Sequence, residues 1–378
     1  MYNKALRNKD TAKSIYICFI RYSMQQIQNI KSPTVRAANN FDIIRILFAW
    51  LVIISHAYIL SGSKQCDWIC EATNHYINFS YFGVKGFITI SGFLIIKSLE
   101  RSPNPIDYLW KRVIRIYPGL IIVLGLTIGM AYLIYQPGNG YFNFKTEAAN
   151  YFFNNLSLYH NQWRIHGVFD NNPNTAINGS LWTMGFEFFF YLVLLLLFPI
   201  RAYKNIVTLF LLIGIGVLLY GNLYHINDLR AVDFKLRIDF IFELGVFFLI
   251  GSFWAMVDWR SLKYDLYLFI AACIWMCIVI GVKMNPIWLS LAWPFIVLYV
   301  GQKTSPIAAW IHRNLEDPSY GIYLYAFPVQ QILIYLFNPS VFVLLWSSTV
   351  IAFALGIGSW KCIEKKILKL KDLFAFRS

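Results

Sequence analysis

The sequence predicts an all-α fold, a polytopic integral membrane bundle of about ten transmembrane helices with both termini in the cytoplasm. Of its 378 residues, 58% are hydrophobic and only 14% are charged, whereas soluble domains carry about a quarter charged residues. The apolar residues also come in blocks of about twenty, the length that an α-helix needs to cross a bilayer. Because these blocks lack the alternation of a barrel strand, we expect helices to span the membrane.

Ten apolar segments are predicted to span, at about 43–62, 79–98, 119–136, 180–199, 205–223, 238–257, 264–282, 285–301, 319–337 and 340–360. Basic residues gather in the amino-terminal tail, the 99–118 loop and the carboxyl-terminal tail, as cytoplasmic segments do. The net charge of +14 therefore indicates topology, and no nucleic-acid partner is expected. One transmembrane domain, 41–362, is predicted between basic cytoplasmic tails at 1–40 and 363–378, without a cleavable signal.

Two polar segments are predicted to lie outside. The long loop 137–179 carries little positive charge, and its aromatic residues favour a packed lid or a sugar-contacting surface, with a structural plug as the alternative. Cys66 and Cys70, in an earlier outer loop, form either a disulfide or two free thiols. No metal is expected, because no second Cys or His pair lies nearby at ligand spacing.

The first spanning helix carries three ionisable residues, Asp42, Arg45 and His56. A charge at the middle of a membrane helix costs about 2.5–3.5 kcal/mol, so each needs a reason to be there. Eleven residues turn a helix through about 1100°, close to three full turns, so Arg45 and His56 share one face about 16 Å apart along the axis. His56 is a candidate general base; the alternative is a histidine bonded to a neighbouring helix carbonyl.

Glu187 is predicted to lie at the depth of His56. It follows the start of the fourth span by seven residues, which places it about 10 Å below the outer surface. A histidine with a nearby carboxylate is common equipment for activating a hydroxyl. The alternative is a structural ion pair between Glu187 and a basic residue.

Arg112 and Arg115, in KRVIRIYPG, are one helical turn apart at the cytoplasmic interface. Guanidinium groups bind phosphates through two parallel hydrogen bonds, so the pair suits a nucleotide-bearing acyl donor. The alternative is simple positive-inside anchoring. Ser91, among small residues in GVKGFITISGF, indicates either close helix packing or a nucleophile that lacks an identified base.

His166 and Asp170 imitate the His-x3-Asp pattern of some soluble acyltransferases. The match consists of two loop residues on the wrong side of the membrane for a coenzyme A donor. We therefore set this pair aside as a chance resemblance.

Four ordered motifs resemble the membrane-bound acyltransferase family 3, which includes bacterial cell-surface polysaccharide O-acetyltransferases. Asp42, Arg45 and His56 match its Asp-x2-Arg-x10-His, and GVKGFITISGFLI is similar to its Gly-Val-x2-Phe-x2-Ile-Ser-Gly. RVIRIYP resembles its Arg-x2-Arg-x-x-Pro, and SLWTMGFEFFFYL its Trp-Ser-x3-Glu-x2-Phe-Tyr helix. The resemblance spans about 42–365. The chain departs from the family at Ala326, which many relatives replace with histidine, so no second catalytic histidine is expected there.

The resemblance implies an O-acyltransferase, most simply an O-acetyltransferase, of the bacterial inner membrane, surrounded by lipid. Acyl-CoA, expected to be acetyl-CoA, would be the donor in the cytoplasm, and the hydroxyl of a surface glycan or its lipid-linked precursor the acceptor outside. Homo-oligomers are compatible with this function.

Residue roles follow from the same motifs. Catalytic roles go to His56, Arg45, Glu187 and Asp42, donor-phosphate contacts to Arg112 and Arg115, and substrate contacts to Trp182, Ser91 and Tyr191. Two other functions compete with the enzyme. Buried charges among ten helices also suit a transporter or exporter, although the sequence lacks two inverted halves. The replacement at Ala326 leaves an inactive scaffold of a polysaccharide-synthesis complex as a third reading.

Overall fold

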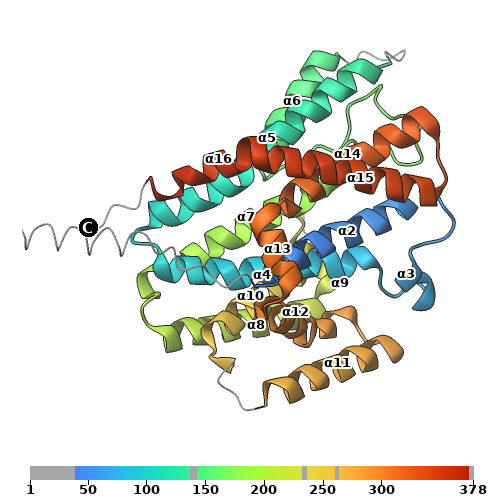
Figure 1. The fold of residues 1–378 in the computed structure, drawn as a ribbon. Helices are drawn as coiled ribbons and strands as arrows, with labels where there is room; N and C mark the ends of the chain where they lie inside the picture. Colours follow the sequence, from blue (N-terminus) through green and yellow to red (C-terminus); the bar gives the residue numbers. More distant parts are fainter. Residues whose placement is uncertain (1–38, 137–142, 232–235, 260–263, 374–378) are drawn as a thin grey trace, which may run out of the picture.

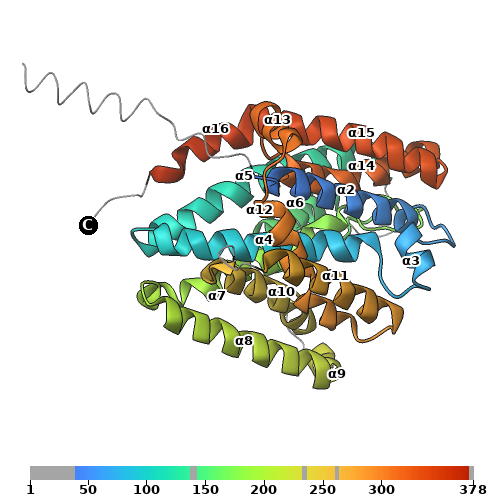
Figure 2. The same cartoon turned by 60° about the horizontal axis from the view of Figure 1, so that its bottom comes forward.

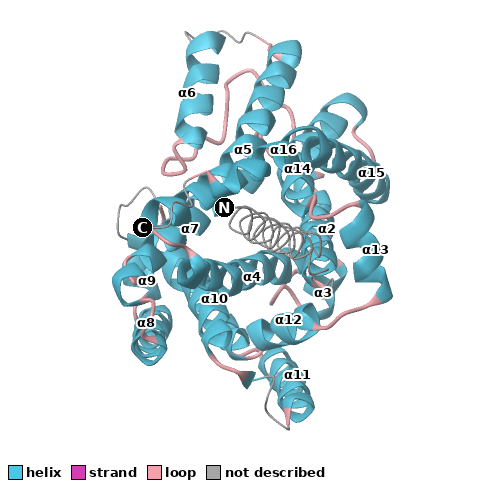
Figure 3. Ribbon diagram, turned by 60° about the vertical axis from the view of Figure 1, so that its left-hand side comes forward, coloured by secondary structure: helices cyan, strands magenta, loops and turns pink. Residues whose placement is uncertain are grey.

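The computed structural model describes residues 39–136, 143–231, 236–259 and 264–373, and all regular elements in these ranges are helical (Figure 3). Seven helices are long and apolar enough to cross a bilayer, and three shorter apolar segments cover Gly179–Leu195, Asp265–Gly281 and Pro286–Gln302. The predicted multi-pass helical membrane fold is confirmed. The count of ten spans and the cytoplasmic termini stay predictions.

The longer helices, in chain order, are α2 (Phe41–Leu60), α4 (Phe79–Arg101), α5 (Pro105–Ile134), α6 (Phe144–Leu156), α7 (Trp182–Leu195), α8 (Lys204–Tyr224), α10 (Ile238–Met256), α11 (Asp265–Gly281), α12 (Trp293–Gln302), α14 (Ser319–Phe337) and α15 (Val341–Ser359). Shorter elements connect them: α3 (Trp68–Ala72), η1 (Gly179–Leu181), η2 (Phe198–Ile200), α9 (Ile226–Ala231), η4 (Pro286–Leu291), α13 (Pro306–Asn314), the π-helical η5 (Trp360–Glu364), α16 (Lys365–Leu368) and η6 (Lys369–Asp372).

Helix α4 runs through the middle of the bundle, with α2 packed along one side and α10 along another (Figure 2). Helix α14 packs against both α2 and α15, and it is the most buried of the seven long helices. Helix α8 lies at one edge of the bundle (Figure 2) and α11 at another (Figure 1), and the apolar side chains of both are largely exposed, as expected of lipid-facing helices. The predicted site residues lie on α2, α4, α5 and α7.

The α4–α10 contact depends on two glycines. A side-chain carbon on Gly92 would lie 2.0 Å from the Phe248 carbonyl oxygen, and one on Gly251 would lie 2.3 Å from the Thr89 carbonyl oxygen. Small residues let membrane helices approach in this way. Beside this contact Lys85 of α4 forms an ion pair with Glu243 of α10, at 2.6 Å between Nζ and Oε1. Two otherwise costly intramembrane charges thus satisfy each other.

Substituting Gly92 should weaken the bundle. In Gly92→Ala the new methyl group meets backbone that cannot rotate away, so we expect a loss of about 1–3 kcal/mol of stability. Thermal unfolding of detergent-purified protein measures it. Gly125→Ala in α5 is the matched control, since nothing lies within 4 Å of its added carbon, and it should be neutral or stabilising by up to about 1 kcal/mol. Equal unfolding temperatures for the two variants would contradict this packing.

The predicted boundary of the third span is wrong. Residues 99–118 were expected to form a cytoplasmic loop, but α5 begins at Pro105 and runs 30 residues through Pro118. The Asn104 side chain accepts a hydrogen bond from the Asp107 amide, and proline is favoured in a first helical turn, so the helix starts early. Arg112 and Arg115 consequently lie on a helix within the bundle.

The segment 143–178 folds onto the bundle. Helix α6 stands beside α5 (Figure 3), with Tyr151 fully buried. The chain then passes along α14 without helical structure: Gln331 donates to the Asn174 carbonyl at 2.7 Å, and Asn178 donates to the Leu324 carbonyl at 3.1 Å. Irregular backbone can lie at this depth because protein surrounds and bonds it. Residues 143–178 of the predicted loop are thus packed, residues 137–142 lie outside the described residues, and the choice among lid, sugar-contacting surface and structural plug stays open.

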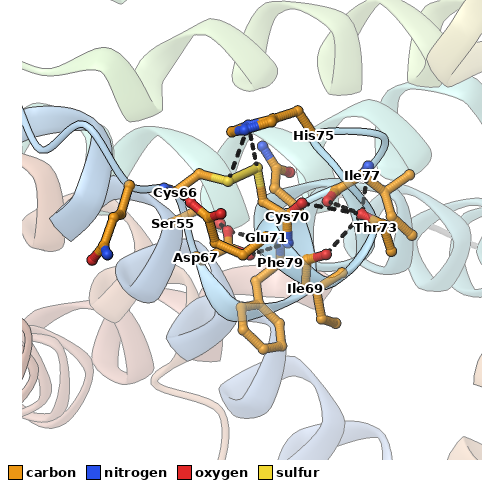
Figure 4. The surroundings of a disulfide bond; sticks show 12 residues. Ser55, Cys66, Asp67, Ile69, Cys70, Glu71, Thr73, His75, Ile77 and Phe79 are labelled. Carbon is orange, nitrogen blue, oxygen red and sulfur yellow. Dashed lines mark hydrogen bonds between the residues drawn. A yellow bond between two sulfur atoms is a disulfide. The ribbon is translucent and has the colours of Figure 1, made fainter.

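Cys66 and Cys70 form a disulfide around α3 (Figure 4). Between them, Asp67 accepts hydrogen bonds from the Ser55 hydroxyl of α2 at 2.5 Å and from the Phe79 amide at the start of α4 at 3.1 Å. This buried carboxylate ties the α2 and α4 ends together. Of the two alternatives left open by the sequence, the structure has the disulfide.

Candidate functional site

Arg45 and His56 face the same neighbour, as the helical spacing predicts. The Arg45 guanidinium forms an ion pair with Asp317, two residues before α14, and the His56 ring meets the edge of Phe327 in α14 at 5.2 Å between centroids. The shared face of α2 is therefore confirmed, and α14 covers it. The two contacts lie at different levels along the bundle axis. We call the level of the Arg45–Asp317 ion pair the Arg45 end, and the level of the His56–Phe327 contact the His56 end.

Asp317 is the centre of the Arg45 end. Its carboxylate accepts from Arg45 of α2 and, at 2.6 Å, from Arg115 of α5. The Ser319 hydroxyl donates to its other oxygen at 2.5 Å. Burial alone would raise the pKa of Asp317, but the two guanidinium groups and the Ser319 bonds outweigh burial and hold that pKa below its ordinary value of 3.8.

This lowered pKa predicts an acid-sensitive contribution to stability. The Asp317 carboxylate stabilises the fold fully above its unfolded pKa of 3.8, and this contribution disappears as pH falls through the lower folded value. The unfolding temperature of the wild type should therefore fall more steeply below about pH 4 than that of Asp317→Asn, which has no group to protonate there. Parallel curves between pH 3 and 6 would contradict the assignment.

Glu187 of α7 lies in a hydroxyl-lined setting. Its Oε1 accepts from the Ser91 hydroxyl of α4 and from the Tyr191 hydroxyl one turn along α7. No described basic side chain forms an ion pair with Glu187 within 4 Å, so the alternative of a structural ion pair is not what the described residues form. The Ser91 hydroxyl therefore has a carboxylate partner, and a nucleophilic role for Ser91 stays a prediction.

Arg112 approaches the same cluster from α5. It donates to the Ser98 hydroxyl at 3.1 Å, and its guanidinium carbon lies 5.9 Å from the centre of the Tyr191 ring. Its Nε is buried and has no hydrogen-bond partner among the described residues. This N–H group can donate a hydrogen bond to a further, anionic partner. Both arginines make contacts inside the bundle, and the choice between donor binding and positive-inside anchoring stays open.

Arg45 and Glu187 line one cavity between α2, α4, α7 and α14. Its walls also include side chains that contribute hydroxyl groups and rings: Phe87, Ser91, Thr183, Tyr320 and Tyr323. The cavity holds about 30 Å³, room for about one or two water molecules. Any ligand larger than a few atoms therefore needs the lining side chains to separate before it can enter.

The predicted depth of Glu187 is wrong. The Ser80 amide donates to the Ser55 hydroxyl at 2.8 Å, which places Ser80 at the level of His56. Ser91, bonded to Glu187, lies eleven residues farther along α4, about 16 Å away. The carboxylate therefore lies at the Arg45 end. The reason is that α7 starts inside the bundle, after the irregular chain has already descended along α14.

His56 stands apart from that cavity. Its Nδ1 is buried and has no hydrogen-bond partner in the described part of the chain, so the alternative of a carbonyl-bonded imidazole is not supported at this atom. Buried polar atoms almost always have partners, and an exception points to strain, catalysis or an unseen group. The Nδ1 atom of His56 is therefore available to a partner outside the described residues, and its predicted role as a base stays a prediction.

Two further predicted residues have partners elsewhere. Asp42 bonds the exposed His312 of α13 at 2.8 Å and does not line the cavity. Trp182 packs against the rings of Phe186 and Phe240. Asp42 thus forms a local ion pair and Trp182 packs locally. The catalytic role of Asp42 and the substrate-binding role of Trp182 stay predictions.

The sequence analysis missed Asp317, Tyr320 and Tyr323, which surround the Arg45 end. It also missed Glu364, which is buried and accepts from Ser359 at 2.8 Å. The sequence does contain one indication of Asp317. It is an acidic residue directly before the span 319–337, at the predicted cytoplasmic end of the helices, where the basic residues also lie. Its partners are distant in sequence, so only the fold identifies them.

His166 and Asp170 each bond another residue of the segment. The His166 ring bonds Glu147 at 2.6 Å, while Asp170 accepts from the Gly167 amide at 2.9 Å.

Within the described residues, one group has potential metal ligands close together, namely Cys66, Cys70 and His75. Two of these share the disulfide, whose sulfurs are not thiolate ligands.

Comparison with known proteins matches this architecture to one family. A family model described as an acyltransferase domain, Acyl_transf_3, covers residues 39–360. A Shigella phage Sf6 protein named O-acetyl transferase is 27% identical over 356 residues, covering 88% of this chain and 96% of the relative. Nodulation protein 10 of Rhizobium leguminosarum bv. viciae is 29% identical over 366 residues, covering 90% and 95%. No solved structure matches. The chain belongs to acyltransferase family 3 and is a multi-pass membrane acyltransferase.

Proposed function

We propose that the protein is an O-acetyltransferase of the bacterial inner membrane that moves an acetyl group from acetyl-CoA to a hydroxyl of a cell-surface glycan or its lipid-linked precursor. The name of the phage Sf6 relative supports the acetyl group and the oxygen acceptor. The observation that carries the proposal is the buried His56 Nδ1 without a partner, on the helix face that also presents Arg45. An imidazole so placed can take a proton from an incoming hydroxyl.

The reaction follows general-base chemistry. His56 removes the proton of the glycan hydroxyl as its oxygen attacks the thioester carbonyl. The tetrahedral intermediate collapses, the carbon–sulfur bond breaks, and the coenzyme A thiolate takes the proton back from the imidazolium. An ester and a free thiol result, and the histidine returns to its starting form.

Arg45, Arg112 and Arg115 are proposed to hold the phosphates of the donor. Guanidinium groups bind phosphate oxygens in pairs, and the Asp317 carboxylate fixes two of these groups before the donor arrives. The long, flexible pantetheine arm of coenzyme A would then cover the roughly 16 Å between the Arg45 end and His56. In this account the Arg45 end faces the cytoplasm.

Glu187 and Ser91 allow a variant in which the acyl group first forms an ester with Ser91. Its hydroxyl already donates to a carboxylate that can take the proton. Ser91 lies about 16 Å from the level of His56, however, so a relay would need a second movement of the acyl group. We therefore favour direct transfer, with Glu187 and Tyr191 shaping the donor cavity.

Purified protein in nanodiscs tests the function. It is supplied with acetyl-labelled acetyl-CoA and with the cell's own surface polysaccharide after removal of esters by mild alkali. The account expects alkali-labile label on carbohydrate and an equal amount of free coenzyme A thiol. Acid-quenched protein without glycan should carry no label under direct transfer. Absence of ester with correctly folded protein would contradict the proposal.

A further inference from the structure

A second hollow, much larger than the donor cavity, lies in the segment 143–178. It has a volume of about 760 Å³ and is open to the surroundings, in the size range of small-molecule sites. Its walls carry amides, rings and one guanidinium: Asn150, Asn154, His160, Asn161, Trp163 and Arg164. The family comparison assigns nothing to this hollow.

The chemistry of these walls suits polyhydroxylated ligands. Asparagine amides both donate and accept, as sugar hydroxyls do. The side chains of Asn150, His160 and Asn161 make no hydrogen bond to any described residue, so their polar atoms are free for a ligand. Trp163 is 42% exposed and offers an apolar ring face for the carbon–hydrogen side of a sugar ring.

The hollow is built before any ligand binds. Asn154 donates to the Gln162 side chain at 3.1 Å, and Gln162 donates to the Arg164 carbonyl at 2.9 Å. Glu147 of α6 accepts from both the backbone and the ring of His166. These bonds hold α6 against the 160–166 chain, so a ligand need not pay the full ordering entropy.

A short series of packed residues connects the floor of the hollow with His56. Asn174 and Ala176 line the hollow, and the buried Gln331 of α14 donates to both of their carbonyls. Phe327, one helical turn before Gln331, carries the ring that meets His56. Pro173 lies against Gly62, just past the end of α2, where an added side-chain carbon would be 2.9 Å away.

From this placement we propose that the hollow is the docking site for the glycan acceptor, holding neighbouring sugars while one hydroxyl reaches His56. This inference rests on the proposed function for the identity of the ligand. The residues involved bind and position substrate, and none of them reacts. Specificity for the glycan would then reside in residues 150–164, separate from the donor cavity.

Direct binding tests the site without catalysis. The probe is the de-esterified surface polysaccharide of the cell, immobilised on a sensor, with nanodisc-embedded protein in solution. Trp163→Ala and Asn150→Ala should each weaken binding, the tryptophan change by about tenfold or more. Trp310→Ala is the matched control, because Trp310 of α13 is 54% exposed and does not line the hollow, and it should bind as the wild type does.

Kinetics separate docking from a structural effect. Both hollow variants should raise KM for the polysaccharide while kcat and KM for acetyl-CoA stay within about twofold. Asn150 is exposed and makes no described side-chain bond, so its substitution should leave folding intact. Wild-type binding and KM in both variants, or a fall in kcat alone, would overturn the inference. If the wild type binds the glycan but forms no ester, the proposed function fails and the docking site stands.

Discussion

His56→Ala should abolish ester formation while leaving expression and membrane insertion unchanged. Removing a general base lowers the rate by a factor of about 10² to 10⁴. No described side chain is hydrogen-bonded to the Nδ1 of His56, so none is in place to act as the base instead. Glycan ester content, determined by mass spectrometry of cells expressing each variant, measures the loss. Insertion should survive because the substitution removes a polar ring from the bundle without breaking a described hydrogen bond at Nδ1.

The matched control for this prediction is His225→Ala. His225 is exposed, bonds only to the neighbouring Asp228 at 3.1 Å among its described side-chain bonds, and lies outside both cavities. Its ester content should equal that of the wild type. Normal esterification by His56→Ala would refute the assigned base, and equal losses in both variants would point to general damage.

Asp317→Asn should reduce both stability and activity. The change leaves two guanidinium groups without their shared carboxylate inside the bundle, and removing one partner of a buried ion pair costs about 3–5 kcal/mol. Arg45 would also lose the contact that aims it, so KM for acetyl-CoA should rise. Thermal unfolding above pH 5 and donor titration measure the two effects.

Asp228→Asn provides the control for Asp317→Asn, since its side chain is 80% exposed and pairs with a surface histidine. Its effect should stay within about 0.5 kcal/mol. Combining Arg115→Gln with Asp317→Asn should cost less than the two single changes together, because both remove the same contact. Strict additivity would show that the two residues do not share an ion pair.

The positions of most helices were predictable because each depends on a local property. An apolar block of the right length ends where polar residues begin, and the spans predicted at 319–337 and 238–257 correspond to α14 and α10. The start of α5 differs from the prediction because basic residues at 111–115 are also typical of a cytoplasmic loop. In the structure Asn104 caps a helix that already starts at Pro105, and Arg115 is held inside the bundle by Asp317, 202 residues away in the sequence.

The site was predictable only in part, because some of its contacts depend on local helical geometry and others on residues distant in sequence. The shared face of Arg45 and His56 follows from helical geometry, so it could be derived from spacing. The level of Glu187 depends on how far the preceding chain descends along α14, and that descent is fixed by bonds from Gln331 and Asn178. Asp317 meets Arg45 across 272 residues of sequence. Pairing over such distances requires the fold.

The central claim is that the acyl group passes from a donor at the Arg45 end to an acceptor at the His56 end. Sealed membrane vesicles of defined orientation, labelled acetyl-CoA and de-esterified polysaccharide test it most directly, because neither substrate crosses the bilayer unaided. We expect labelled ester when acetyl-CoA is on the cytoplasmic side and the polysaccharide on the opposite side, and none when both are on the same side. Ester formation with both substrates on one side would contradict the claim.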